Sequence, residues 1–163
     1  RSVPIVNPAI VDPASIKTYA DLANPALKGK LCLRNRKSPY NQSLVADQII
    51  LRGEAATAKW IRGMANNVTQ EFFPKDTPQV QAVGKGKCGV AVVNTYYVGR
   101  MLAGRKGADN KALAEKVKVV FPNPTHVNVS GAGVTASSDN PEAALKLIEF
   151  LASPNAEIGR AHV

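Results

Sequence analysis

Short apolar runs alternate along this chain with longer segments in which apolar residues recur at helical spacing. Four runs rich in Val, Ile and Leu predict β-strands, at residues 3–7, 30–34, 88–94 and 117–121. Because strands that alternate with helices usually build one layered sheet, the pattern predicts an α/β fold with a mostly parallel sheet.

The helical spacing is clearest after the second run. Gly53 separates two segments whose apolar residues are Val45 and Ile49, then Ala56, Trp60 and Met64. By contrast, residues 104–110 predict a polar loop by composition.

Two further helices are predicted by their first residues. Thr77-Pro78 and Asn140-Pro141 each combine a helix-capping residue with Pro at the first helical position. The helix after Asn140 has Ala144, Ile148 and Leu151 on one face, which predicts packing against a core.

Composition limits the classes of function. The 163 residues are 45% hydrophobic, enough for one domain with a real core, and no apolar run approaches the roughly 18 residues of a membrane span. The net charge of +9 would suit a nucleic-acid partner. However, the only dense basic cluster lacks the interleaved aromatic residues of a stacking platform; its members are Lys28, Lys30, Arg34, Arg36 and Lys37. The distribution favours a solvated basic surface and argues against nucleic acid.

Tyrosines follow two of the predicted strands. Tyr96 and Tyr97 come directly after the third apolar run, and Tyr40 follows the second. In open α/β sheets ligands bind at the carboxyl ends of the strands, so these phenols are expected to share one site. A phenol ionises only near pH 10, but a highly charged cation stabilises the phenolate, and a hard ion such as Fe³⁺ suits its oxygen. The alternative is half-buried packing with the hydroxyls in water.

Four motifs resemble the bacterial ferric-iron-binding proteins, the extracytoplasmic substrate-binding components of iron ABC transporters. They are GKLCLR at 29–34, YNQSL at 40–44, NTYYVGR at 94–100 and HVNVSGAGV at 126–134, and the resemblance runs from about Val3 to Asn155. It implies a type II periplasmic-binding-protein-like fold with two lobes, of which one is nearly complete here and the other partial.

The resemblance also implies how the chain is divided. Residues 1–10 are expected to hold the entry and a hinge strand, 11–116 the second α/β lobe, 117–121 the return hinge strand and 122–157 part of the first lobe. Residues 158–163 depart from the family pattern and are expected to be a non-native tail. Family members take further ligands, commonly His or Tyr, from an early first-lobe segment that we expect to lie outside these residues.

The function implied is ferric iron uptake. Tyr40, Tyr96 and Tyr97 would each supply one phenolate oxygen to Fe³⁺ in the cleft between the lobes, and Asn41, Asn94 and Arg100 would orient these ligands or balance their charge. A periplasmic or otherwise extracytoplasmic monomer would deliver the ion to an inner-membrane ABC permease, with a synergistic anion as a further optional ligand.

The two cysteines each lie at the start of a predicted strand. If these strands are neighbours, Cys32 and Cys88 are within reach of a disulfide, which export from the cytoplasm would permit. The alternative is a pair of buried free thiols.

Other residues support no catalytic function. The chain has two histidines and no evident pairing of a nucleophile with a base, so we do not expect an enzyme. His126 has no second imidazole at metal spacing and is expected to be a hydrogen-bonded structural residue.

The rival functions use the same fold. A solute-binding protein could hold a small anion at the Gly-rich turn 130–133, although the turn lacks the nucleotide-loop pattern, or an organic cation on the aromatic rings. A ligand-sensing domain of a transcription regulator would need a recognition helix, and none is evident.

Overall fold

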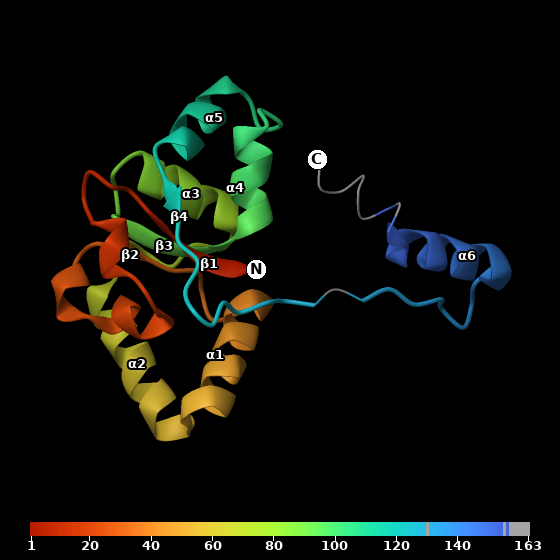
Figure 1. The fold of residues 1–163 in the computed structure, drawn as a ribbon, viewed down its shortest axis with the longest axis horizontal. Helices are drawn as coiled ribbons and strands as arrows, with labels where there is room; N and C mark the ends of the chain where they lie inside the picture. The colour runs from red at the N-terminus through yellow and green to blue at the C-terminus, as the bar shows by residue number, and fades with distance from the viewer. Residues whose placement is uncertain (130, 155, 157–163) are drawn as a thin grey trace. The chain divides into compact units, whose positions relative to one another are not determined.

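The computed structural model describes residues 1–129, 131–154 and 156, which belong to a compact unit, Arg1–Asn128, and a second unit that begins at Val129 (Figure 1). In the compact unit four strands form one sheet in the order β2-β3-β1-β4. The strands are β1 (Ser2–Val6), β2 (Leu31–Cys32), β3 (Val90–Asn94) and β4 (Lys118–Val119). Every predicted strand is therefore confirmed, with β1 shifted by one residue and the others shortened.

The strand directions correct the prediction of a mostly parallel sheet. Only β2 and β3 are parallel, with Leu31 opposite Val90, whereas β1 runs antiparallel to both β3 and β4. A parallel pair needs a long crossover, and the helices between β2 and β3 provide one. After β1 the chain instead passes through short 3₁₀ helices at Pro13–Ser15, Tyr19–Ala23 and Pro25–Leu27.

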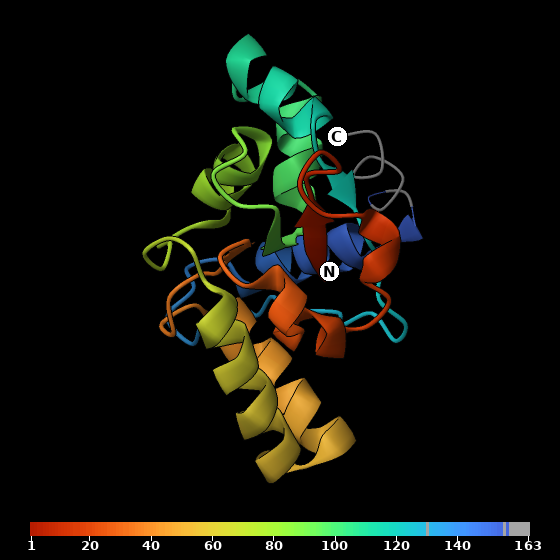
Figure 2. The same cartoon turned by 90° about the vertical axis from the view of Figure 1, so that its left-hand side faces the viewer.

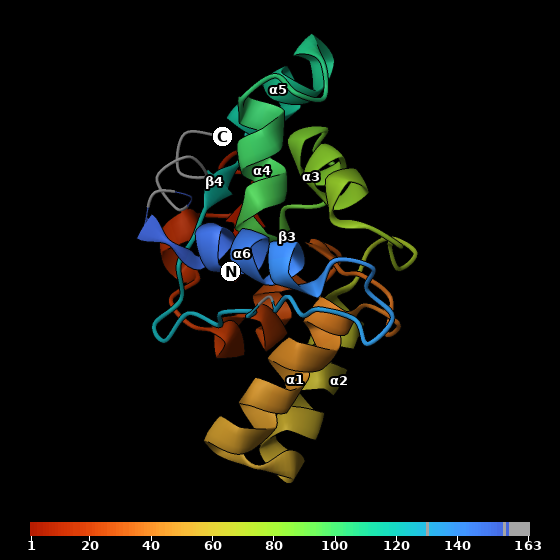
Figure 3. The ribbon, with the colours of Figure 1, turned by 90° about the vertical axis from the view of Figure 1, so that its right-hand side faces the viewer.

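The sheet separates two hydrophobic cores, because successive side chains of a strand point to opposite faces. Val90 and Val92 of β3 belong to the core that contains Trp60, whereas Ala91 and Val93 belong to the other. The first face is covered by the 3₁₀ segments and by α1 (Pro39–Arg52) and α2 (Glu54–Asn67), as Figure 2 shows. The second is covered by α3 (Asp76–Gly84), α4 (Thr95–Leu102) and α5 (Ala108–Glu115), seen in Figure 3.

The break between α1 and α2 lies where the sequence predicts it. Gly53 lies between the two helices and has φ +84°, a conformation that residues with a Cβ rarely adopt, and α1 and α2 meet at an angle in Figure 1. Trp60 of α2 anchors the pair to the domain, since its Nε1 donates a hydrogen bond to the Tyr19 carbonyl at 2.6 Å.

Two predictions about the helices differ from the structure, and one helix start is confirmed. Helix α3 begins at Asp76 rather than after a Thr77 cap, so Pro78 lies within the first turn, where its missing N–H has no cost. Residues 108–110 of the expected polar loop form the start of α5. Helix α6 (Pro141–Ala152) belongs to the second unit and has the predicted Asn140 cap, whose Oδ1 accepts from the Ala143 amide.

The cysteines meet beside the parallel pair of strands. Cys32 ends β2 and Cys88 lies two residues before β3, and the structure joins them in a disulfide with Cα atoms 5.9 Å apart. Within the described residues no helix combines the length and apolar character that a membrane span needs.

Candidate metal centre

The tyrosines lie at one edge of the sheet. Because β2 and β3 are parallel neighbours, their carboxyl ends meet at the same edge. Tyr40 is the second residue of α1, the helix that follows β2, while Tyr96 and Tyr97 are the second and third residues of α4, which follows β3 directly. All three phenols therefore extend from the first turn of a helix, where the helix dipole favours negative charge.

The local sequence explains why these helices start there. Ser38 caps α1 by accepting a hydrogen bond from the Asn41 amide at 3.4 Å, and Pro39 occupies the first helical position. At the other helix, Asn94 is the last residue of β3 and the cap of α4, so strand and helix join without a loop.

The structure brings the three predicted tyrosines together. The Tyr96 hydroxyl donates a hydrogen bond to the Tyr40 hydroxyl at 2.9 Å, which joins residues 56 positions apart in the sequence. The Tyr96 and Tyr97 rings have centroids 4.5 Å apart and planes tilted by 33°. Tyr96 is 40% exposed, so the cluster is open to solvent.

The environment keeps the central phenol protonated in the absence of a cation. Burial raises the pKa of the Tyr96 phenol above its ordinary value of 10.0, and the hydrogen bond to Tyr40 and the neighbouring Tyr97 raise it further. Once one phenol of such a cluster has ionised, its negative charge disfavours ionisation of its neighbours. A cation bound among the phenols would offset this repulsion and stabilise several phenolates at once.

Two guanidinium groups cover the faces of these rings. Arg100 lies over the Tyr96 ring at 5.5 Å from its centroid, and Arg34 lies over the Tyr40 ring at 5.4 Å. Arg100 was singled out by its sequence position near the tyrosines, whereas Arg34 was not. Both place positive charge beside a phenol that would have to ionise.

The two asparagines contact the site indirectly. Asn41 Nδ2 donates to the Arg34 carbonyl at 3.1 Å. Asn94 donates from its backbone nitrogen and from Nδ2 to Asp76 Oδ2, at 2.9 and 3.0 Å. Among the described residues neither asparagine has a hydrogen bond to a tyrosine, so each can act on the phenols only through its neighbours.

Asp76 is the group near the site that sequence reasoning missed. It is 1% exposed and pairs with Arg34, whose Nη1 lies 2.8 Å from Asp76 Oδ1. The two residues lie 42 positions apart. The only sequence signal was a carboxylate just before Thr77-Pro78, a position that equally suits an ordinary helix start.

His126 is a hydrogen-bonded residue, as predicted. Its Nε2 lies 3.1 Å from Ser43 Oγ and 3.2 Å from Asn128 Oδ1, and its amide donates to the Tyr19 hydroxyl at 3.0 Å. Within the described residues no group of three His, Cys, Asp or Glu side chains could hold a metal.

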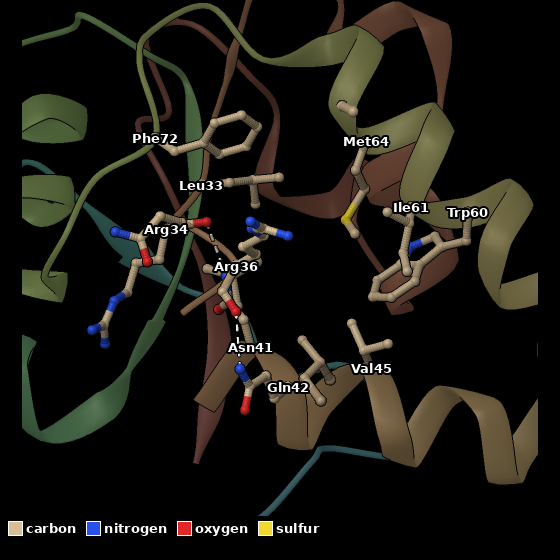
Figure 4. A pocket seen from close by; sticks show the side chains of 14 residues that line it. Leu33, Arg34, Arg36, Asn41, Gln42, Val45, Trp60, Ile61, Met64 and Phe72 are labelled. Atoms are coloured by element: carbon tan, nitrogen blue, oxygen red, sulfur yellow. Dashed lines mark hydrogen bonds between the residues drawn. The ribbon is translucent and has the colours of Figure 1, made fainter. Parts of the chain in front are cut away.

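The other proposed solute sites gain no support. Gly131 and Gly133 of the Gly-rich turn are exposed, and Ser130 lies outside the described residues. A cavity of about 640 Å³ opens between α1 and α2 (Figure 4) and is lined by apolar side chains such as Leu33, Met64 and Phe72. Its lining includes Arg34 and Asn41 but none of the three tyrosines.

Comparisons with known proteins agree with the fold. The chain is 43% identical over 155 residues to iron uptake protein A1 of Synechocystis sp., covering 93% of this chain and 43% of the relative. It is 31% identical over 141 residues to the major ferric iron-binding protein of Neisseria meningitidis serogroup B, covering 84% of this chain and 40% of the relative.

Solved structures give the same result. The Trichodesmium FutA protein, also named IdiA, in complex with iron and citrate superposes with a TM-score of 0.86 at 37% identity, over 95% of this chain and 50% of that one. The ferric binding protein of Campylobacter jejuni superposes with a TM-score of 0.86 at 31% identity, over 94% and 50%. This chain thus spans about half the length of the relatives that it matches, and the fold is that of a type II periplasmic binding protein. Since residues 3–161 match the family of bacterial extracellular solute-binding proteins, the chain belongs to that family.

Proposed function

We propose that this chain carries the ferric-iron site of a solute-binding protein for iron uptake. Tyr40, Tyr96 and Tyr97 each give one phenolate oxygen to Fe³⁺. The observation that supports the proposal is the 2.9 Å hydrogen bond between the Tyr96 and Tyr40 hydroxyls, because two phenol oxygens this close could both bind one ion. The relatives named for ferric iron binding support the choice of ion.

The three phenolates account for the charge but not for the whole coordination shell. Their three negative charges balance Fe³⁺, and three oxygens fill about half of the six positions of a hard octahedral ion. The remaining positions are left to water, a synergistic anion or side chains from elsewhere in the protein.

The hinge between the two lobes is proposed from the sheet. Because β1 and β4 are adjacent antiparallel strands where the chain is expected to cross between the lobes, we assign residues 1–10 and 117–121 to this hinge.

Closure of the lobes about that hinge would shield the ion, as in other periplasmic binding proteins, and present a closed face to an ABC permease. The protein would act outside the cytoplasm as a monomer and without catalysis. An organic cation is the weaker alternative, because Arg34 and Arg100 already cover one face each of the Tyr40 and Tyr96 rings.

Iron titration of single-tyrosine variants tests the proposal. Phenolate bound to Fe³⁺ absorbs visible light, so the purified chain should colour on addition of a ferric chelate, and Tyr40→Phe or Tyr97→Phe should weaken both the colour and the affinity. Tyr19→Phe is the matched control, since Tyr19 is 3% exposed and its hydroxyl donates to the Ser2 carbonyl. A colourless protein, or equal colour in all variants, would contradict the proposal.

A further inference from the structure

A single buried carboxylate, Asp76, contacts a residue that precedes each of the two tyrosine-bearing helices: Arg34 before α1 and Asn94 before α4. Asp76 Oδ1 accepts a hydrogen bond from Arg34 Nη1 at 2.8 Å, and Asp76 Oδ2 accepts from the backbone nitrogen and Nδ2 of Asn94 at 2.9 and 3.0 Å. These are three charge-assisted hydrogen bonds in a site that is 1% exposed. The carboxylate is thus fixed at the junction of β2, β3 and α3.

Arg34 connects Asp76 to Tyr40, because it contacts both residues. With one guanidinium nitrogen held by Asp76, Arg34 Nη2 donates to the Pro74 carbonyl at 2.9 Å, so the planar group has one orientation. In that orientation it lies over the Tyr40 ring. The Arg34 carbonyl also accepts from Asn41, the residue next to Tyr40, so backbone and side chain of Arg34 both brace the start of α1.

Asn94 connects Asp76 to the helix that carries Tyr96 and Tyr97. Asn94 is two residues before Tyr96 and caps α4, and Asp76 holds both its backbone nitrogen and its side chain. The direction in which α4 leaves the sheet is therefore tied to the same carboxylate that orients Arg34. A buried ion pair is costly to desolvate and often adds little net stability compared with apolar residues of the same volume, so a role in geometry is the better account of this one.

We propose that Asp76 is a positioning residue that sets the distance between the Tyr40 phenol and the Tyr96 and Tyr97 phenols, and so the fit of the cluster to one ferric ion. This inference rests on the proposed function. Among the described residues Asp76 has hydrogen bonds to Arg34 and Asn94 and none to a phenol, so it is not proposed as a ligand. Its effect passes through Arg34 on one side and through Asn94 on the other.

Asp76→Asn is the most informative substitution, because it keeps the shape of the side chain but removes its charge and replaces one acceptor oxygen by an amide NH₂ group. That group then faces the donor of Arg34 or the donors of Asn94, depending on which oxygen it replaces. We expect at least a tenfold loss of Fe³⁺ affinity in citrate competition and a shift of the visible phenolate-to-iron band. Asp21→Asn is the matched control: Asp21 also accepts three hydrogen bonds, from Lys17 and Thr18, at a site without tyrosine ligands. The control should lower stability while leaving band and affinity unchanged.

The outcomes separate this inference from the function on which it rests. If the unmodified protein shows no visible band with Fe³⁺, the proposed function fails. If it shows the band, and Asp76→Asn binds with the same affinity and the same band, the positioning role is overturned. If Asp76→Asn does not fold, Arg34→Lys is tested in its place. The lysine keeps a positive charge for Asp76 but cannot donate to both Asp76 and the Pro74 carbonyl as the planar guanidinium does. An unchanged band and affinity in Arg34→Lys would then overturn the inference, and a shifted band would support it.

Discussion

Iron binding should release protons, and the number released counts the phenols that bind. A phenol in water ionises only near pH 10, and burial together with the hydrogen bond to Tyr40 raises the pKa of Tyr96 above that value. Fe³⁺ must therefore displace three protons, one from each of Tyr40, Tyr96 and Tyr97. Because lower pH makes each proton harder to displace, affinity should fall as pH falls.

The size of the pH effect on Fe³⁺ affinity follows from the number of protons displaced. One displaced proton changes the free energy of binding by about 1.4 kcal/mol per pH unit, so three displaced protons change it by about 4 kcal/mol, or about a thousandfold in affinity, for each pH unit below the phenol pKa values. Calorimetry in two buffers of different ionisation enthalpy gives the proton number directly, once the protons taken up by the ferric chelate are subtracted.

Variants make the proton count specific to the site. We expect about three protons for the unmodified chain and for Tyr19→Phe, and about two for Tyr96→Phe, because the phenylalanine has no proton to lose. A corrected count near zero, or one that Tyr96→Phe leaves unchanged, would refute the reasoning that phenolates hold the ion.

Three further predictions concern stability and the coordination shell. Replacing Cys32 and Cys88 by Ser should lower the free energy of unfolding by about 4 kcal/mol, since the bridge spans 56 residues, and thiol titration of the unfolded, unreduced protein should find no free thiol. Gly84→Ala should destabilise by about 1–3 kcal/mol in urea unfolding, because its Cβ would lie 2.5 Å from the Leu113 carbonyl oxygen, whereas Gly99→Ala has open space and should gain up to about 1 kcal/mol. With half the coordination shell supplied by phenols, this chain alone should lose Fe³⁺ to citrate more readily than a two-lobed relative does, and equal retention would show that no further ligands are needed.

The position of the tyrosines was predictable because it follows from local rules. An apolar run predicts a buried strand, and the edge at which parallel strands end is where ligands collect, so Tyr40 and Tyr96 could be assigned to one site from their positions alone. The close approach of Tyr97 to Tyr96 was less certain, because adjacent side chains on a regular helix diverge. The first turn of α4, directly after β3, is where the two rings come together.

The direction of β1 and the partners of Asp76 were not predictable in the same way. An apolar run has the same pattern whether its neighbour is parallel or antiparallel, so the sequence predicts that β1 exists but not how it pairs. The ion pair of Asp76 with Arg34 depends on tertiary contacts across 42 positions, and each residue alone has an ordinary local role. For α5, Asp109 and Asn110 are polar because the helix is largely exposed, so composition favoured a loop.

A crystal structure of the iron-loaded protein, with anomalous scattering recorded at the iron edge, would test the ferric site most directly. The account predicts one strong anomalous peak at coordination distance, about 2 Å, from the hydroxyl oxygens of Tyr40, Tyr96 and Tyr97. A peak elsewhere, for example at His126, with the three phenols free of metal, would contradict it.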